Sequence, residues 1–228
     1  MNIAVVTIII PIYNEEKNLL EKIGQFRNLS KSAELIFVDG KSSDNSCSIA
    51  VAYGKILHSK AGRAAQMNSG VTQARGDILL FLHADNIILT DTLETIERKI
   101  TEDGYIGGCL TQRIDNNALI YRLIEWQGNT RARLTREFYG DQGIFVKKNT
   151  FLRMGGFPEV PIMEDVLFSR RLRTIGKTVV LSDKITVSAR RWEKNGIIKT
   201  ALIFNLIIIL FWLKAPLHKI KQFYEDIR

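Results

Sequence analysis

The strongest constraint on the fold is a regular alternation of short apolar runs with longer amphipathic segments over the first hundred residues. The apolar runs occupy residues 5–10, 34–40, 55–59 and 77–85. The amphipathic segments, with helical spacing, follow them at residues 14–29, 42–54, 62–76 and 90–100. Strands that alternate with helices of about 10 to 15 residues indicate βαβ units. We therefore expect an α/β fold, with a Rossmann-like, mostly parallel central sheet and helices on both faces.

The second half of the chain contains the same two kinds of segment with less regularity. The predicted elements are strands at 105–114 and 143–148, helices at 116–136 and 164–176, and a pair of short strands within 178–192. No internal repeat or low-complexity linker separates the halves. We expect one domain over residues 1–195, followed by an apolar and basic helical segment over 196–228.

The apolar part of that last segment, residues 201–213, contains one polar residue, Asn205. It is too short to span a bilayer comfortably, because a span takes about 20 apolar residues. Two interpretations remain open: a helix packed against its own domain or a dimer partner, and a helix on a membrane surface. The second is favoured by lysines that suit anionic lipid, at Lys199, Lys214, Lys219 and Lys221.

Charge and cysteine content narrow the class of partner. The chain has 32 Lys and Arg against 24 Asp and Glu, a net charge of +8, which suits anionic partners. It lacks a recognisable nucleic-acid module, so we expect no nucleic acid. Cys47 and Cys109 predict free cytosolic thiols rather than a disulfide scaffold or zinc site. The first ten residues lack the basic region and cleavage site of a signal peptide and predict a strand.

Polar side chains follow three of the predicted strands directly: Asn14 and Glu15, then Asp39, then His83 and Asp85. Each alone is an ordinary turn or helix-start residue. The carboxyl ends of parallel strands meet at one edge of a sheet, where ligands bind. Crowded carboxylates repel one another unless a cation lies among them, and a divalent cation carrying a nucleotide diphosphate suits this need.

A set of motifs in characteristic order carries a family resemblance: PIYNEE, IFVDGKSSDNS, GRAAQMNSG, GDILLFLHAD, YGDQGIFVKK, GGFPEVPIMEDVLFSRRLR and SARRW. They run from about residue 10 to 192. In this combination the chain resembles glycosyltransferase family 2, which has the GT-A fold, and most closely its bacterial radical-SAM/selenodomain-associated subgroup. The resemblance implies a nucleoside-diphosphate sugar as donor, with a UDP-sugar favoured.

The resemblance also implies a donor site and a divalent metal, Mn²⁺ or Mg²⁺. The residues expected around the base, ribose or phosphates are Pro11, Tyr13, Glu15, Asp39 and Arg63. The family's Asp-x-Asp metal motif reads here as His83-Ala84-Asp85, which leaves Asp85 on the ion. His83 departs from the motif; it is a metal ligand, a ribose contact or a satisfied strand-end histidine. Imidazole would favour manganese.

Family members generally invert the anomeric centre, which requires a general base near the acceptor hydroxyl. The resemblance implies Asp165 as this base, with Glu164 as its neighbour or replacement, although an acidic pair also suits a helix start. Arg191 and Trp192 match a Gln-x-x-Arg-Trp motif of processive relatives and are expected near the leaving group; Ser188 replaces its glutamine. Weaker expectations place Asp141, Gln142 and Trp126 on the acceptor side.

The sequence therefore predicts an inverting, metal-dependent glycosyltransferase in the cytoplasm, with possible peripheral attachment to the inner face of the membrane. Its acceptor is unknown, and a lipid-linked one would suit the apolar C-terminal segment. A homodimer is an open alternative use of that segment. Two other functions are alternatives: a nucleotidyltransferase, and a non-catalytic nucleotide-binding or membrane-associated module. The glutamates after the first strand would repel a triphosphate, which disfavours the nucleotidyltransferase.

Overall fold

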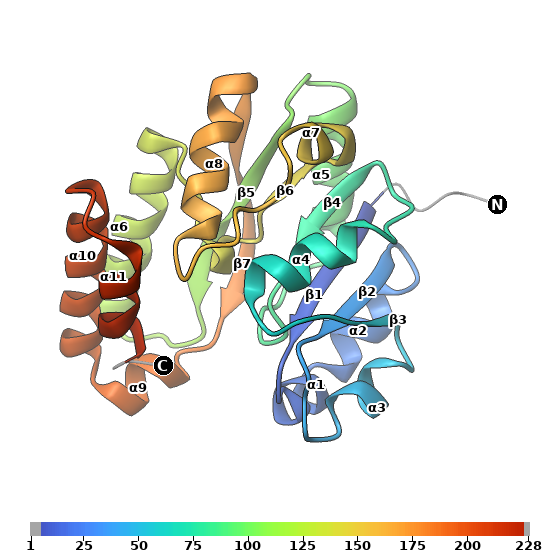
Figure 1. Ribbon diagram of the computed structural model, residues 1–228, viewed down its shortest axis with the longest axis horizontal. Coiled ribbons are helices and arrows are strands. Elements are labelled where there is room, and N and C mark those ends of the chain that lie inside the picture. Colours follow the sequence, from blue (N-terminus) through green and yellow to red (C-terminus); the bar gives the residue numbers. More distant parts are fainter. Residues whose placement is uncertain (1–5, 226–228) are drawn as a thin grey trace.

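The computed structural model describes residues 6–225 and contains a seven-stranded central sheet (Figure 1). The strands are β1 Val6–Ile12, β2 Glu34–Asp39, β3 Lys55–His58, β4 Ile78–Phe81, β5 Gly107–Ile114, β6 Phe145–Lys147 and β7 Thr178–Val187. Their order across the sheet is β3-β2-β1-β4-β6-β5-β7. All neighbouring pairs are parallel except those of β6, which is antiparallel to β4 and β5. The predicted mostly parallel α/β sheet is confirmed.

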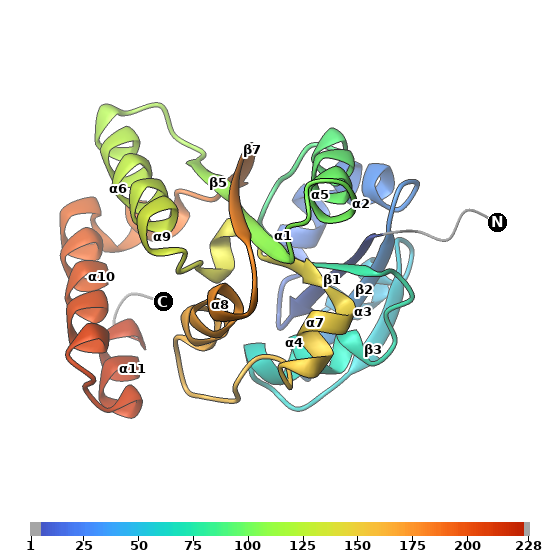
Figure 2. The same ribbon diagram turned by 90° about the horizontal axis from the view of Figure 1, so that it is seen from above.

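Helices cover both faces of this sheet (Figure 2). One face carries α1 Glu16–Glu21, α2 Ile23–Leu29, α3 Ser46–Ala50 and α5 Asp91–Thr101. The other carries α4 Arg63–Val71, α6 Leu119–Thr135, α7 Lys148–Arg153 and α8 Glu164–Ile175. Alternate residues of β1 enter the two resulting cores: Ile8 and Ile10 pack on the first side and Ile9 on the second. Since both faces are covered, a continuous apolar run is needed in the strand.

Three predicted segments have different boundaries in the structure. The helix predicted over 14–29 is two helices, because the backbone of Lys22 leaves the helical region. The strand predicted over 77–85 ends at Phe81, and the residues after it turn. The pair of short strands predicted within 178–192 is one strand, β7, which continues past an irregularity in its pairing with β5. The SARRW motif therefore leads into a helix, and residues 1–5 of the predicted first strand lie outside the described residues.

The C-terminal segment forms α9 Arg190–Asn195, α10 Ile197–Trp212 and α11 Leu217–Glu225. One side of α10 packs inward, where Ile207 and Phe211 share a cluster with Ile162 and Val166 at the start of α8. None of the described helices combines the length and apolar character that crossing a bilayer requires. The segment thus packs against its own domain, as one of the two interpretations proposed, but with only part of its surface. The domain division at residue 195 stays a prediction.

Candidate active site

A pocket of about 520 Å³ opens at the carboxyl ends of β1 and β4. Its floor comes from the segments that follow these strands, and α4, α8 and the C-terminal helices contribute its walls. The predicted site residues that line it are Pro11, Tyr13, Glu15, Arg63, His83, Asp85, Asp141, Glu164, Asp165, Arg191 and Trp192. The topology therefore gathers most of the sequence-predicted site, from segments up to about 180 residues apart, as doubly wound sheets do.

The turn after β4 presents Asp85 to this pocket. The side-chain oxygen of Asn86 accepts a hydrogen bond from the His83 amide at 2.9 Å, and the Asn86 amide donates to the His83 carbonyl at 3.1 Å. Asn86 is almost fully buried, so its two hydrogen bonds hold the turn from the protein interior. The strand ends here because Asn86 closes the turn with its own side chain and amide. Asp85 stands at the turn, lining the pocket.

His83 contributes a neutral imidazole to the same pocket. Burial, and then the positive charges of Arg63 and Arg191, lower the pKa of His83 to about 3. Its Nε2 is buried and has no hydrogen-bond partner among the described residues. An imidazole nitrogen and a carboxylate are both divalent-metal ligands. The residues present therefore fit the metal that the motif implies, with an orphaned donor atom as the structural observation.

Asp165 and Glu164 form the first turn of α8. Both carboxylates are buried, and each oxygen of Asp165 accepts one backbone N–H: Oδ2 from Gly140 at 2.6 Å and Oδ1 from Val166 at 2.7 Å. Burial, followed by repulsion from Glu164, raises the pKa of Asp165 to about 6. Glu164 in turn faces the Arg63 guanidinium at 3.6 Å. Asp165 is thus a buried carboxylate at the pocket whose proton affinity is raised above the ordinary value.

Arg63 and Arg191 bring positive charge to the pocket, and both donate a hydrogen bond to the hydroxyl of Tyr224. Arg63, at the start of α4, donates to the Tyr224 hydroxyl at 3.4 Å, and Arg191 donates to it at 3.1 Å. Beside them, Trp192 packs against the ring of Phe204 with 5.3 Å between centroids. Two guanidinium groups in one pocket, of which Arg63 also faces the Glu164 carboxylate, suit an anionic leaving group.

The opposite side of the pocket is formed by the segment that follows β1. Tyr13 exposes 51% of its surface, so its ring is available for stacking on a flat ligand. Glu15 accepts a hydrogen bond from the Asn18 side chain, which orients its carboxylate. Pro11 and Glu15 also line the pocket. This side therefore offers an aromatic face and a carboxylate, which suit a nucleoside base and ribose.

Asp39 is not among the residues that line the pocket. Its carboxylate accepts the amides of Lys41 at 3.2 Å and Ser42 at 3.0 Å, and it contacts His58 Nδ1 at 3.2 Å. Gln66 lies between Asp39's turn and the pocket, donating to the carbonyls of Ile12 and Val38. The structure thus places the predicted base-binding aspartate beside the pocket, with its side chain engaged by its own loop.

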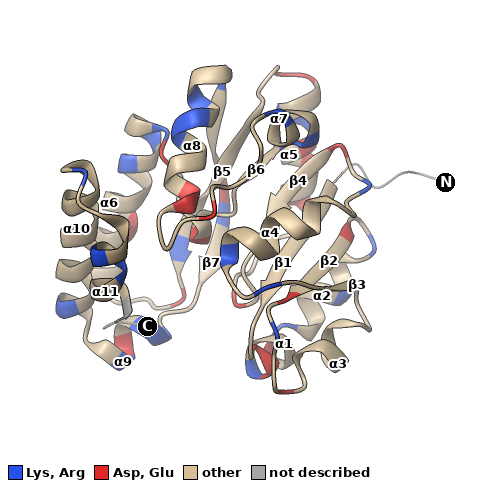
Figure 3. Cartoon of the chain, in the orientation of Figure 1, with Lys and Arg blue, Asp and Glu red and all other residues tan. Residues whose placement is uncertain are grey.

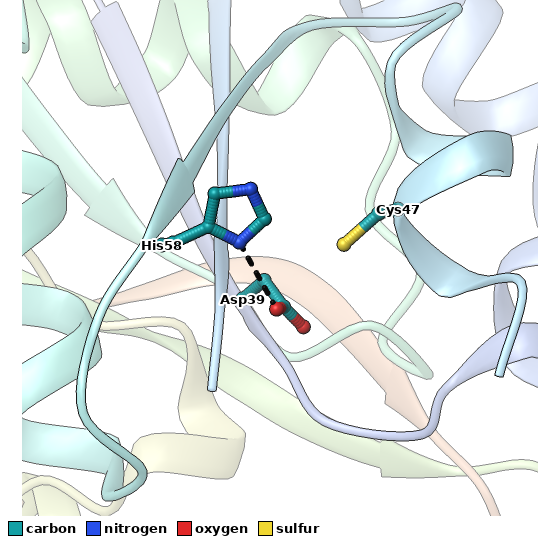
Figure 4. A group of neighbouring side chains, drawn as sticks. All are labelled: Asp39, Cys47 and His58. Atoms are coloured by element: carbon teal, nitrogen blue, oxygen red, sulfur yellow. Dashed lines mark hydrogen bonds and ion pairs between the residues drawn. The ribbon is translucent and has the colours of Figure 1, made fainter. Parts of the chain in front are cut away.

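Asp39 belongs to a second group of possible metal ligands. Figure 4 shows its carboxylate, the Cys47 thiol and the His58 imidazole converging from the ends of β2 and β3 and from α3. Their ligand atoms lie within 4.8 Å of one another. Burial, and then the charge of Asp39, raise the pKa of Cys47, so the thiol is protonated at neutral pH. Because the His58 side chain is 74% exposed, this group is open to solvent and separate from the pocket.

Two residues expected on the acceptor side, Gln142 and Trp126, do not line the pocket. Gln142 is buried, and its Oε1 accepts the Tyr139 amide at 3.1 Å, so it holds the loop of η1, Gly140–Gln142. Trp126 exposes 65% of its surface on α6 and does not line the pocket, because its helical face points away from the sheet. Asp141 does line the pocket, where Gln112 donates to its carboxylate at 2.6 Å.

Sequence reasoning missed a group of pocket residues from the C-terminal helices, namely Phe204, Ile207 and Tyr224. The apolar composition of residues 201–213 indicated a buried or lipid-facing helix, but nothing in the spacing connects it with a polar pocket. Tyr224 contacts Arg63 across 161 residues of sequence. These residues give the pocket an apolar and aromatic wall that complements its charged floor.

Comparison with known proteins identifies the family. The family model described as Glycosyl transferase family 2 matches residues 7–160. Among curated relatives, the chain is 29% identical over 106 residues to glycosyltransferase GlyG of Streptococcus pneumoniae serotype 4, covering 42% of this chain and 35% of that protein. It is 34% identical over 115 residues to the undecaprenyl-phosphate 4-deoxy-4-formamido-L-arabinose transferase of Photorhabdus laumondii, covering 44% and 34%. The chain spans about a third of the length of these curated relatives.

Solved structures with the same fold have low sequence identity to this chain. The mannosyltransferase PcManGT from Pyrobaculum calidifontis, in complex with GDP-Man and Mn²⁺, superimposes with a TM-score of 0.67 at 19% identity, covering 84% of this chain and 61% of that one. Residues 1–349 of TarS from S. aureus, in complex with UDP-GlcNAc, give a TM-score of 0.64 at 20% identity, covering 80% and 58%. At these identities the likeness establishes the fold, which is GT-A.

Proposed function

The chain belongs to glycosyl transferase family 2 and is a glycosyltransferase, and from this premise we propose that its pocket transfers a sugar from a nucleoside-diphosphate sugar with inversion. A UDP-sugar is the favoured donor. The observation that carries the proposal is the pairing, in one pocket, of an available carboxylate at Asp165 with the two guanidinium groups of Arg63 and Arg191. Membership of the radical-SAM/selenodomain-associated subgroup stays a prediction.

The reaction needs one base and one stabilised leaving group. Asp165 accepts the proton of the acceptor hydroxyl as its oxygen forms a bond to the anomeric carbon. The bond from that carbon to the diphosphate oxygen breaks on the opposite face, and the nucleoside diphosphate leaves with the electron pair. Arg191 and Arg63 lie where they can interact with this developing negative charge. Tyr13, Pro11 and Glu15 hold the nucleoside.

Asp85 and His83 would hold the divalent metal, which supplies positive charge to the diphosphate oxygens when bound. Asp85 is a hard oxygen ligand, and the unpartnered Nε2 of His83 is a nitrogen ligand that divalent manganese accepts more readily than magnesium. We propose Mn²⁺ or Mg²⁺ on this basis. The exposed group at Asp39, Cys47 and His58 has a soft thiol and is not proposed for this role.

The base also constrains the acceptor. A phosphate oxygen is already ionised at neutral pH and needs no base, whereas a hydroxyl does. We infer that the acceptor presents a hydroxyl, on the side of the pocket where Asp165 and Asp141 lie. The neighbouring apolar wall of Phe204 and Ile207 supports a lipid-linked acceptor. Relatives named undecaprenyl-phosphate transferases support the lipid part alone, because their printed name gives a phosphate rather than a hydroxyl. The proposed location is cytoplasmic, peripheral on the inner face of the membrane.

Thermal unfolding with a panel of nucleoside diphosphates and sugar nucleotides, each with and without Mn²⁺, tests the donor site. A ligand that binds only the folded state stabilises it by about 2.7 kcal/mol at a hundredfold excess over Kd. We expect one diphosphate to raise the melting temperature in a metal-dependent way. No shift with any member of the panel, in folded protein, would instead favour a non-catalytic module.

Substitution of the metal ligand makes the test specific. Asp85→Ala should fold and lose the metal-dependent part of the shift. The matched control is Asp103→Ala, which removes an exposed carboxylate that pairs with Lys99 far from the pocket, and it should keep the full shift. A wild-type metal response in Asp85→Ala contradicts the metal assignment.

A further inference from the structure

Large apolar side chains are exposed along one side of two neighbouring helices. On α6 they are Leu119, Ile120, Leu123 and Trp126. On α10 they are Ile198, Leu202, Leu206, Ile209 and Trp212. Their spacing of three or four residues puts each set on one helical face. A run of exposed leucine, isoleucine and tryptophan of this length is unusual for a monomer surface and marks an interaction site.

A side-chain hydrogen bond joins the two sets into one surface. Gln127 Nε2 on α6 donates to Asn205 Oδ1 on α10 at 2.8 Å, and Figures 1 and 2 both show these helices side by side. Asn205 Nδ2 also donates to the Ala201 carbonyl of its own helix at 2.9 Å. The polar groups in the middle of the apolar surface therefore hydrogen-bond to one another, which lowers the free-energy cost of removing them from water. We call this surface the α6–α10 face.

The charge along α10 and α11 is positive, while the exposed carboxylates of Asp115 and Glu193 lie just before α6 and α10. Between Glu193 and Glu225 the sequence has no acidic residue and five lysines: Lys194, Lys199, Lys214, Lys219 and Lys221. In Figure 3 the middle of α10 carries no charge, the lysine of α10 lies toward one end of that helix, and the lysines of α11 lie near the middle of theirs. An apolar strip with basic ends and no carboxylates is the pattern of helices that lie in the interface of an anionic bilayer.

The inward side of α10 connects this face with the pocket. Ile207 is buried and lines the pocket together with Phe204, while Leu206 and Ile209 on the same helix face outward. A single helix therefore separates the exposed apolar face from the proposed acceptor side. An acceptor whose chain stays in a bilayer would have a short distance to reach Asp165.

We propose that the α6–α10 face docks on the surface of an anionic membrane, with α10 lying in the interface. This deepens the proposed function, on which it rests for the identity of the acceptor, by giving the lipid partner a binding surface. Trp126 and Trp212 would lie at headgroup depth, where indole rings are favoured.

Charge favours this occupant over a second copy of the chain. A twofold contact through the α6–α10 face would bring the lysines beside α10 of both copies together, because such an interface is self-complementary. Of the residues between 194 and 224, none supplies a carboxylate to offset that repulsion. Anionic lipid headgroups offset it directly.

Sedimentation with phospholipid vesicles, with and without an anionic lipid, tests the proposal. The wild-type chain should bind anionic vesicles and lose most binding at high salt or with purely zwitterionic lipid. The variant Leu123→Glu/Leu206→Glu, which puts one charge on each helix, should bind at least about tenfold more weakly, since a carboxylate in the interface opposes both apolar burial and the anionic surface. The matched control is Leu152→Glu on α7, where a 54% exposed leucine lies on a different part of the molecule.

Fluorescence quenching by brominated lipids adds a local readout. Trp126 and Trp212 should be quenched on binding, and Trp126→Phe should lose part of that quenching. Wild-type binding by the double variant, or equal loss in Leu152→Glu, would overturn the proposal, as would no binding to any vesicle. A concentration-dependent dimer that the double variant abolishes, without vesicle binding, would assign the face to a second copy. The donor-induced melting shift, measured in parallel, reports failure of the donor site separately.

Discussion

Asp165 lines the pocket and has a raised proton affinity, and this combination gives a pH dependence. A base must be deprotonated, and the pKa of Asp165 is about 6 because burial and Glu164 disfavour its charged form. We expect kcat/KM to rise with pH through an apparent pKa of about 6. Glu164→Gln removes the repelling charge and should shift that limb to lower pH. A pH–rate profile measured on both proteins checks the direction.

The base itself has a conservative variant. Asp165→Asn keeps the size of the side chain and removes the proton acceptor, so turnover should fall by about 10²- to 10⁴-fold. Donor binding, followed by the melting shift, should be retained, because Asp165 is assigned to the acceptor hydroxyl.

The pH profile of Glu164→Gln has its own contrary outcome. If kcat/KM still rises through the same apparent pKa in this variant, a group other than Asp165 controls the rise.

At the residue scale, the sequence predicted the polar floor of the pocket and missed its apolar wall. Asp85 and Asp165 could be assigned because each lies in a motif at the end of a strand or the start of a helix. Tyr224 could not, because its contacts with Arg63 and Arg191 arise only when the last helix folds back over the sheet. Trp126 does not line the pocket, and the pattern of an amphipathic helix does not show which of its faces meets a site.

Among the elements, β5 and β7 approach too closely for any side chain at Gly108. A Cβ there would lie 2.1 Å from the backbone carbonyl oxygen of Val179 and 2.8 Å from the ring of Phe145. Because backbone cannot move aside cheaply, Gly108→Ala should destabilise the fold by about 1–3 kcal/mol or more. Urea unfolding measures this change in the free energy of unfolding.

A second glycine provides the matched control. Gly24 lies in the exposed first turn of α2, and a Cβ there meets nothing within 4 Å. Gly24→Ala should therefore stabilise the protein, by up to about 1 kcal/mol, because alanine has the better helix propensity. Equal effects of the two substitutions would contradict the close strand contact.

The element predictions succeeded where burial dictated the pattern. β1, β2 and β4 are apolar on both sides because helices cover both faces, and the sequence shows this directly. Boundaries were less accessible. The helix break occurs at Lys22, where the sequence has no proline or glycine to indicate it. The turn after Phe81 depends on Asn86, whose side chain accepts a hydrogen bond from the amide of His83, three residues earlier.

For the molecule as a whole, Tyr224 links the last helix to the first half of the chain. Its hydroxyl accepts hydrogen bonds from Arg191 and from Arg63. Tyr224→Phe should lower the free energy of unfolding by about 1 kcal/mol, the usual net value of such a bond. In a double-mutant cycle with Arg191→Gln, the two losses should be less than additive, which thermal unfolding can measure. Additive losses would contradict a shared contact.

The position of β6 in the sheet has a consequence for the order in which the protein assembles. β4 pairs with β6, whose residues lie more than 60 positions further along the chain, while β5 comes between them in sequence and sits beyond β6 in space. The pairing of β4 with β6 at the centre of the sheet therefore forms only after the long segment between them has been synthesised. Forming this pair also costs the conformational entropy of that connecting loop. Long-range pairing of this kind slows folding. The half that holds Asp85 can form βαβ units early, but the pocket becomes complete only when β6 has been inserted and α8 follows it.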